Sequence, residues 1–222
     1  MPNRDPRRWV FDQGAEVYGW LTWQDTWRGH CGSLVDAFPD TPAGPDILDL
    51  GTGTGVSAIG ILDRCPDARV TGVDFSPRML AAARRYLRRS GREVRLVEAS
   101  AESLPFAPGS FDVVTGHSFL YLTRHPDKVL AEARRVLKPG GRCVFLEPQQ
   151  ALPDGAWRRI AGGARFTISM ALWRLASGRA GRFDPASLSE LLSHEFEEVR
   201  VTEALWGFGL LVSGRAPAIR GS

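Results

Sequence analysis

The sequence predicts an α/β fold in which a parallel sheet is covered by helices. Through the middle of the chain, short β-branched and apolar runs alternate with helical stretches, without internal repeats or low-complexity tracts. A glycine-rich stretch, 51–55, lies directly between the first such run and the first helical stretch. The chain has 222 residues, of which 43% are hydrophobic, enough for one sizeable core. We therefore expect one domain over residues 1–222.

Local signals mark the elements of the first part of the sheet. Strands are expected at 47–50, 70–74, 94–99, 111–115 and 142–146, and helices at 56–62, from 77 to about 90, and from 126 onward. Ser76 followed by Pro77 is typical of an N-cap and a first helical turn. Pro139, Gly140 and Gly141 predict the end of the helix that Pro126 opens.

The last third of the chain predicts an insertion followed by a closing hairpin. Residues 148–182 are helix-prone and rich in Trp, Arg and Gly, and we expect them above the carboxyl ends of the strands. Asp184 and Pro185 predict the start of a helix that reaches His194. Strands at 199–204 and 208–214 follow, and their tight connection at Trp206 and Gly207 favours antiparallel pairing. The expected parts are an aromatic cap (1–45), a cofactor-binding core (46–147), the insertion (148–183), and a terminal helix with its hairpin (184–222).

Composition narrows the classes of protein. No apolar run reaches the length of a membrane span, and the N-terminus lacks the apolar core of a signal peptide, so we expect a cytoplasmic protein without a span. Three widely spaced cysteines argue against a disulfide framework or a zinc site. The net charge of +3 and the pI near 9.0 come almost entirely from arginine. The densest arginine cluster, within 84–89, predicts a solvated helix face rather than a nucleic-acid track.

The glycine loop and one acidic residue predict an adenosine site. Glycines after a strand let the backbone approach a ligand at the carboxyl edge of the sheet. A dinucleotide fingerprint needs a third glycine where this chain has Val56, which weakens the NAD interpretation. Asp74 ends the second strand, where a carboxylate can accept hydrogen bonds from ribose hydroxyls. The alternative, that Asp74 only caps the next helix, is weakened by Ser76 at the cap position.

Five motifs occur in order across about half of the chain. They are DLGTGTG (49–55), VDFSPRML (73–80), AESLPF (101–106), FDVV (111–114) and LKPGG (137–141). This series closely resembles class I S-adenosylmethionine-dependent methyltransferases, particularly the quinone-biosynthesis branch. The resemblance implies a Rossmann-like sheet of seven strands in the order 3-2-1-4-5-7-6, with strand 7 antiparallel and helices on both faces.

The resemblance also assigns the cofactor-binding residues by position. It places Asp49, Gly51, Thr52 and Gly53 around the methionine part of S-adenosylmethionine, Asp74 on the ribose, Phe75 and Met79 near the adenine, and Ser100, Ala101 and Glu102 along its edge. The family often has aspartate where this chain has Ser100. A serine hydroxyl can still bond the adenine amino group, so the expected contact is weaker.

Two residues are candidates for catalysis, and no metal is expected. His117 follows the fourth strand, faces the methyl donor in the resembling family, and has a side chain that can take a proton near neutral pH. The alternative is that His117 is only a neighbour of the cofactor. Tyr18 is favoured as part of a lid over the cofactor, whereas Trp20, Trp23 and Trp27 favour a core stripe. The sequence has no metal-ligand cluster of convincing spacing.

The sequence therefore predicts a methyltransferase that acts on a small, hydrophobic or aromatic metabolite, as a monomer or homodimer. Aromatic residues in the insertion, among them Trp157 and Trp173, are expected to enclose the acceptor. Two alternatives remain open at this stage. One is a methyltransferase acting on nucleic acid, suggested by the basic pI. The other is a non-methylating protein that binds the same cofactor in the same fold.

Overall fold

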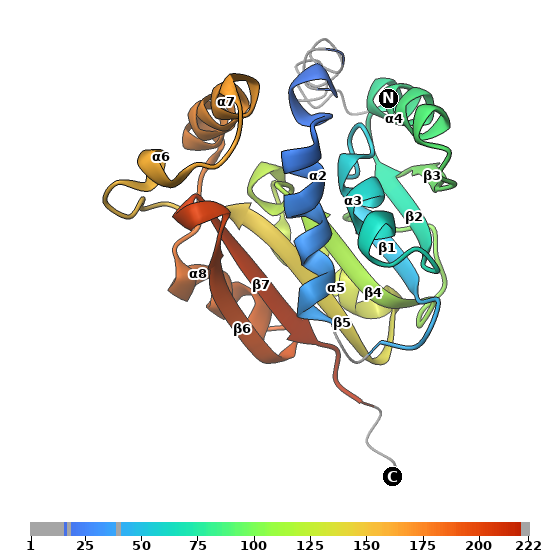
Figure 1. Cartoon of the computed structure of the whole chain (residues 1–222). Coiled ribbons are helices and arrows are strands. Elements are labelled where there is room, and N and C mark those ends of the chain that lie inside the picture. Colours follow the sequence, from blue (N-terminus) through green and yellow to red (C-terminus); the bar gives the residue numbers. More distant parts are fainter. Residues whose placement is uncertain (1–15, 17–18, 39–40, 219–222) are drawn as a thin grey trace, which may run out of the picture.

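The computed structural model describes residue 16, residues 19–38 and residues 41–218 (Figure 1). The strands are β1 Asp46–Leu50, β2 Arg69–Asp74, β3 Arg95–Glu98, β4 Phe111–His117, β5 Leu137–Pro148, β6 Glu197–Ala204 and β7 Gly209–Arg215. The helices are α2 Asp25–Gly32, α3 Val56–Arg64, α4 Pro77–Ser90, α5 Pro126–Val136, α6 Ala156–Arg159, α7 Ala164–Ala180 and α8 Pro185–Ser193. Three short 3₁₀ turns are η1 Ser33–Ala37, η2 Leu120–Leu122 and η3 Leu205–Gly207.

The strands form a seven-stranded sheet in the order β3-β2-β1-β4-β5-β7-β6. Strands β1 to β5 pair in parallel, and β7 runs antiparallel to both β5 and β6. This confirms the expected order and the antiparallel seventh strand. It also brings the carboxyl ends of β1, β2 and β4 to one edge of the sheet, where ligands bind in open α/β folds.

Helices cover both faces of the sheet. Helices α2, α3 and α4 lie in front of it in Figure 1, and α5 and α8 lie behind. Adjacent strand residues alternate between the two cores: Ile47 packs in front and Leu48 behind, and Val113 and Val114 divide in the same way. Because both faces are covered, most residues of the central strands are apolar, which explains their short hydrophobic runs.

The start of β5 differs from the sequence-based expectation. The residues expected to end the preceding helix belong to the strand instead, because α5 already ends at Val136 and β5 begins at Leu137. Leu137 pairs with Phe111, and the register then shifts before the next pairs form. The Lys138 ammonium bonds both carboxylate oxygens of Asp112 at 2.9 Å, which holds this irregular segment to β4.

The carboxyl-terminal part follows the predicted pattern. Asp184 caps α8 by accepting hydrogen bonds from two backbone N–H groups, each at 3.0 Å. The turn between β6 and β7 places Leu205 and Trp206 at positive φ, 52° and 55°. Helices α6 and α7 project beside the carboxyl edge of the sheet (Figure 1). Within the described part of the chain, no helix is long and apolar enough to cross a membrane.

Candidate active site

The glycine loop connects β1 to α3 in a tight turn. Gly51, Gly53 and Gly55 have φ values of 63°, 54° and 85°, which glycine adopts without strain. The Thr52 N–H donates to the Val73 carbonyl at 3.0 Å and so ties the loop to β2. A side chain at Gly51 would collide with the ring of Phe119, which lies against the loop.

Asp49 lies beneath this loop and is fully buried. Its carboxylate accepts hydrogen bonds from the Ser57 hydroxyl at 2.5 Å and from the Thr115 hydroxyl at 3.1 Å. Burial raises the pKa of Asp49 above its usual value. The hydroxyls join the end of β1 to α3 and β4, so the side chain of Asp49 fixes the base of the loop.

Asp74 connects the glycine loop to α4. One carboxylate oxygen accepts from the Gly53 N–H at 3.0 Å and the other from the Ser76 N–H at 2.9 Å. Ser76 itself caps α4, because its hydroxyl accepts from the Met79 N–H at 3.2 Å. Capping is therefore performed by Ser76, and Asp74 presents its carboxylate beside the glycine backbone, where the ribose of an adenosine cofactor is expected.

The residues expected around the adenine follow β2 and β3. Met79 is buried in α4, whereas Phe75 is 37% exposed. The Ala99 N–H donates to the Asp74 carbonyl at 3.2 Å, which brings the segment after β3 beside the end of β2. In that segment Ser100 is exposed and Ala101 and Glu102 are half-buried. The Ser100 hydroxyl accepts from the Glu102 N–H at 3.2 Å, so the three residues form a compact turn at the expected edge.

His117 ends β4; the residue as a whole is half-buried, and Nε2 of its ring is buried. The ring meets Trp27 edge-on, with 5.7 Å between centroids. Burial, and in second place the nearby His30, lowers the pKa of His117 from 6.5 to about 4. In the isolated protein the ring is therefore neutral near pH 7, because a buried imidazole resists becoming charged. The role of His117 as a proton acceptor stays a prediction.

An aromatic wall stands over His117 and consists of Trp27, His30, Phe166, Trp173 and Trp206. Trp27 is the centre of it: its ring lies 5.3 Å from Phe166 and 5.9 Å from Trp173, centroid to centroid. Its indole N–H donates to the Ser169 hydroxyl at 2.6 Å. His30 in turn meets Phe166 and Trp206, at 5.9 and 4.8 Å. Helix α7 of the insertion is thereby joined to α2.

The other tryptophans have different ring partners. Trp23 stacks on Tyr86 at 4.5 Å and is only partly buried. Trp20 is 58% exposed beneath the Arg165 guanidinium, so the expected core stripe is wrong at Trp20. Trp157 is 45% exposed, and its ring meets that of Phe208 edge-on at 4.7 Å between centroids. Tyr18, expected in a lid, lies outside the described residues.

Buried polar atoms without a hydrogen-bond partner among the described residues gather at this edge. They include His117 Nε2, Ser118 Oγ, Gln149 Oε1 and Trp173 Nε1. Burying such atoms unpaired costs about 1–3 kcal/mol each, so they indicate a place where a ligand supplies partners. A few polar groups among buried apolar and aromatic side chains are typical of the lining of a small-molecule site. The residues present therefore fit a nucleoside cofactor beside an apolar acceptor.

Glu147 is a site residue that the sequence interpretation missed. It is fully buried at the end of β5, and its carboxylate accepts from the N–H groups of Phe119, Leu120 and Tyr121 at 3.1, 2.8 and 3.3 Å. Burial raises the pKa of Glu147 to about 7. Glu147 thus holds the turn that follows His117. An acidic residue ending the apolar run 143–146 was the available signal.

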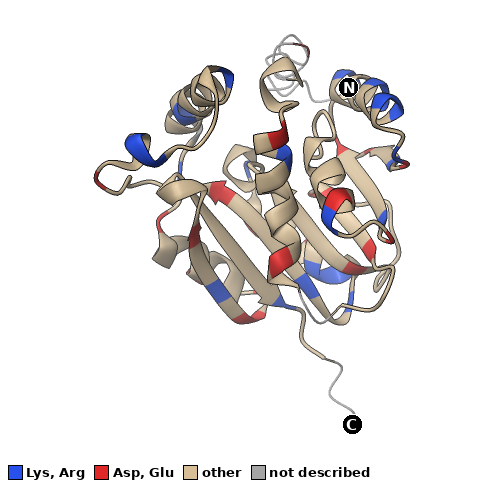
Figure 2. Ribbon diagram, in the orientation of Figure 1, with Lys and Arg blue, Asp and Glu red and all other residues tan. Residues whose placement is uncertain are grey.

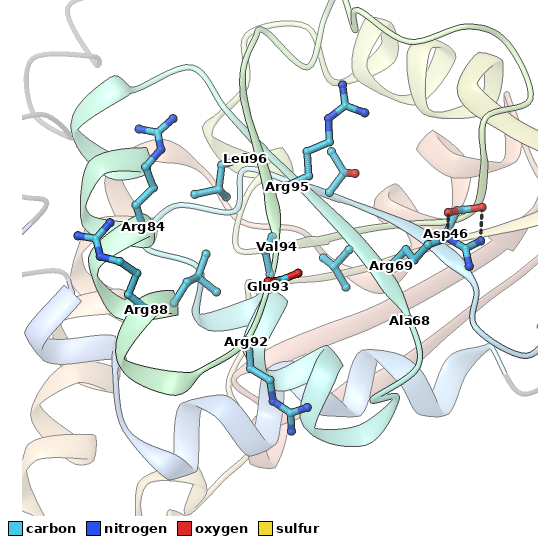
Figure 3. Close-up of a pocket in the computed structure, with 13 residues that line it drawn as sticks. Asp46, Ala68, Arg69, Arg84, Arg88, Arg92, Glu93, Val94, Arg95 and Leu96 are labelled. Carbon is cyan, nitrogen blue, oxygen red and sulfur yellow. Dashed lines mark hydrogen bonds and ion pairs between the residues drawn. The ribbon is translucent and has the colours of Figure 1, made fainter.

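A groove of about 820 Å³ lies at the opposite, amino end of β2 and β3 (Figure 3). Arg84 and Arg88 line it, together with Arg69, whose guanidinium pairs with Asp46 at 2.7 Å. This groove is remote from the glycine loop and Asp74. Over the described ranges, no group of three or more His, Cys, Asp or Glu residues could hold a metal ion.

Comparisons with known proteins agree with this geometry. A family model described as a methyltransferase domain matches residues 47–141. A demethylmenaquinone methyltransferase of Thermus thermophilus is 51% identical over 102 residues, 46% of this chain and 46% of that protein. One of Deinococcus radiodurans is 41% identical over 165 residues, 73% of this chain and 67% of its own. The chain thus spans about half the length of the Thermus relative that it matches.

A likeness to solved structures extends over more of the chain. A SAM dependent methyltransferase from Aquifex aeolicus superposes with a TM-score of 0.69, covering 91% of this chain and 98% of that one. The sequences are 16% identical, so this likeness concerns the fold. It includes regions outside 47–141.

Proposed function

The chain belongs to the class I S-adenosylmethionine-dependent methyltransferases, and from this premise we propose that it transfers a methyl group from S-adenosylmethionine to a small hydrophobic or aromatic molecule. The observation that carries the proposal is the contact of Asp74 with the glycine loop, at 3.0 Å from the Gly53 nitrogen. This contact places the Asp74 carboxylate, which can bind ribose hydroxyls, beside a glycine backbone that a ligand can approach closely.

The described residues have complementary parts in this proposal. When bound, the cofactor supplies a methyl group that is already activated, so the protein mainly aligns the acceptor and excludes water. Asp49 and its two hydroxyl partners hold the glycine loop in position. Glu147 holds the turn after β4, and the aromatic wall keeps water from the reacting groups. We propose His117 and Tyr18 as catalytic or orienting residues beside the acceptor.

The proposed acceptor is an apolar ring compound. The relatives are named for methylation of demethylmenaquinone, and we extend that broad class of acceptor to this chain. The wall of Trp27, Phe166 and Trp173 favours an aromatic molecule, since rings pair edge-to-face or offset at these distances. The family model ends at residue 141, before α7. We propose that α7, which lies outside the matched range, helps to select the acceptor.

The proposal also favours a small molecule over nucleic acid. The arginine-lined groove lies at the amino end of β2 and β3, remote from Asp74 and His117, so phosphate contacts there would not present a base to the site. We propose the cytoplasm as the location, where free Cys31, Cys65 and Cys143 would stay reduced. The assembly is proposed as a monomer or homodimer.

The test is turnover with a panel of acceptors. Purified protein and S-adenosylmethionine are incubated with demethylmenaquinone analogues, phenols, apolar amines and nucleic acid, and S-adenosylhomocysteine is measured beside the mass of each acceptor. We expect an apolar ring compound to gain the mass of one methyl group. Cofactor binding without turnover on any acceptor would favour the non-methylating alternative. Methylated nucleic acid alone would overturn the small-molecule proposal.

A further inference from the structure

Helix α7 is apolar on two opposite faces. Phe166, Met170 and Trp173 face inward, where the first two are almost fully buried and Trp173 joins the aromatic wall. On the other side, Ile168, Leu172 and Leu175 form an outward stripe at spacings of four and three. Their side chains are 54%, 45% and 57% exposed. A helix that is apolar on both sides is expected to have both covered, and here the second side faces outward.

The same segment has a strong positive charge. Residues 151–183 contain six arginines and one acidic residue, Asp154, so their formal charge is +5, while the whole chain has +3. The rest of the chain is therefore negative overall. Figure 2 shows the basic positions on α6 and α7 at the upper left of the molecule. Arg158 and Arg179 form no ion pair with any residue that the structure describes, so their charge is available to a partner.

We propose that the outward face of α7, with α6 beside it, docks on the surface of an anionic phospholipid bilayer. Exposed leucine and isoleucine side chains can enter the boundary between headgroups and acyl chains, while arginines bind the lipid phosphates. Trp157 on α6 is 45% exposed, and tryptophan is enriched at this boundary. The contact is peripheral, since the stripe covers only one side of a helix whose other side belongs to the protein.

Charge decides between the bilayer and a second copy of the chain. Two copies meeting through their outward stripes would bring two segments of +5 together, and this repulsion opposes association. An anionic bilayer supplies the opposite charge over the whole face. It also accepts the three apolar side chains without needing a matching pocket, which a protein partner would have to provide.

The docking face and the acceptor site share one helix. Trp173 of the aromatic wall lies between Leu172 and Leu175 in sequence but turns to the opposite side. An apolar acceptor dissolved in the bilayer would therefore reach the wall from the helix that contacts the lipid. This inference goes beyond the proposed function, because it concerns a surface that binds lipid whether or not an acceptor or cofactor is present.

The experiment measures binding of the whole chain to vesicles without cofactor or acceptor. Sedimentation with phosphatidylcholine vesicles, with and without phosphatidylglycerol, gives the partition coefficient at physiological salt. We expect strong binding to the anionic vesicles, weaker binding to the neutral ones, and a decrease with added salt. Replacing the stripe (Ile168→Ser, Leu172→Ser, Leu175→Ser) should lower partitioning about a hundredfold or more, since each apolar side chain contributes through burial.

Two matched charge variants test whether the arginines of this face bind the vesicles or whether binding reflects only the net charge of the protein. The double variant Arg158→Gln and Arg179→Gln should lower binding to anionic vesicles about tenfold or more, because each arginine near the surface contributes about fivefold. The control, Arg84→Gln with Arg88→Gln, removes the same charge from the groove on the other side and should change binding less than about twofold. Melting temperatures and S-adenosylhomocysteine affinity should match the wild type in all three variants.

Each result decides the proposal separately from the proposed function. Wild-type protein that does not partition onto anionic vesicles overturns the docking face, even if methyl transfer is found. Equal losses in the two arginine pairs overturn it too, because binding would then reflect net charge. A dimer in sedimentation velocity that the stripe variant abolishes, without vesicle binding, would assign the face to a second copy. Stripe-dependent vesicle binding supports the proposal even if no acceptor is turned over.

Discussion

At the residue scale, Asp74 and His117 differ in whether their side-chain atoms have hydrogen-bond partners. The carboxylate of Asp74 already accepts two backbone N–H groups, whereas Nε2 of His117 is buried without a partner among the described residues. Asp74 is thus held in place by the backbone, and Nε2 of His117 can still accept a hydrogen bond from a bound ligand. Their substitutions are expected to affect different steps.

Replacing Asp74 by Ala should weaken S-adenosylhomocysteine at least about tenfold, because charge-assisted hydrogen bonds to the ribose contribute about 1.5–3 kcal/mol each. Calorimetry measures the affinity. The control separates loss of the ribose contact from a disturbed loop, because Asp74→Ala also removes the acceptor of the Gly53 N–H.

This control uses an analogue of the ligand that lacks the 2′-hydroxyl. Wild-type protein should bind that analogue more weakly than S-adenosylhomocysteine, and the variant should bind both equally. Equal discrimination by both proteins would place the ribose elsewhere. Asp46→Ala, at the other end of the sheet, should leave affinity unchanged.

His117→Ala tests a buried neutral imidazole. Since the pKa of His117 is lowered to about 4, the ring stays neutral from about pH 5 upward and can accept a hydrogen bond or proton throughout that range. We expect wild-type turnover to show no imidazole limb near pH 6.5. For an acceptor that must lose a proton, the variant should lose roughly a hundredfold in turnover with little change in cofactor affinity.

The control for this variant is His125→Ala, an exposed histidine at the start of α5, which should behave as wild type. Full activity of His117→Ala with a proven hydroxyl acceptor would remove His117 from the chemistry. A limb near pH 6.5 that disappears only in His117→Ala would show that the acceptor or cofactor restores the usual pKa of the ring.

At the element scale, Glu147 links β5 to the turn after β4 and predicts a dependence of stability on pH. The pKa of Glu147 is about 7 in the folded protein and 4.5 without burial, so between these values the folded state holds a proton that the unfolded chain has lost. The free energy of unfolding therefore falls as pH rises from 4.5 to 7, and this contribution is constant above pH 7. Glu147→Gln should abolish it.

The measurement is denaturant unfolding of both proteins across pH 4.5 to 8. The difference between wild type and Glu147→Gln is the informative quantity, because His117, with its lowered pKa, makes stability rise over about pH 4 to 6.5 in both proteins. A difference that does not change with pH would mean that Glu147 keeps an ordinary pKa, because its three amide contacts, which lower the pKa, then offset the effect of burial.

The tryptophans of α6 and α7 differ in their contacts with the aromatic wall. Trp173 lies 5.9 Å from Trp27 in the aromatic wall, whereas Trp157 packs on Phe208 and is 45% exposed. Trp173→Ala should raise the KM of the acceptor about tenfold while that of the cofactor changes less than about twofold. Trp157→Ala serves as the matched control and should change neither. Equal effects on both substrates, or only a lower Tm, would assign Trp173 to packing.

At the scale of the whole molecule, a ligand that bridges several strand ends should stabilise the folded chain. S-adenosylhomocysteine at 100 times its Kd should add about 2.7 kcal/mol to the free energy of unfolding, and for a domain of this size that raises the Tm by several degrees. NAD should give no shift, since Val56 stands where a dinucleotide loop has its third glycine. Differential scanning calorimetry measures both. A larger shift with NAD would contradict the assignment of the cofactor.

The order of strands and helices, the glycine loop and the place of Asp74 at the end of β2 can all be predicted from the amino-acid sequence alone. These features depend on short-range physics: glycine torsions at 51, 53 and 55, the cap at Ser76, and apolar runs that match covered strands. Even so, the boundary at Leu137 was misplaced, because a proline and two glycines stop a helix and can also begin an irregular strand. Here the segment forms a strand, and the hydrogen bonds of Lys138 to Asp112, 26 residues earlier, hold it to β4.

Which side chains meet at the carboxyl edge, and which of them are charged, depends on contacts between segments that are distant in sequence. Trp27 reaches Ser169, 142 residues later, and Glu147 binds the turn at Leu120, 27 residues earlier. The lowered pKa of His117 and the raised pKa of Glu147 both arise from burial by segments distant in sequence. The exposure of Ile168, Leu172 and Leu175 could not be predicted either. When a helix is apolar on several sides, its sequence does not show which side the rest of the chain covers.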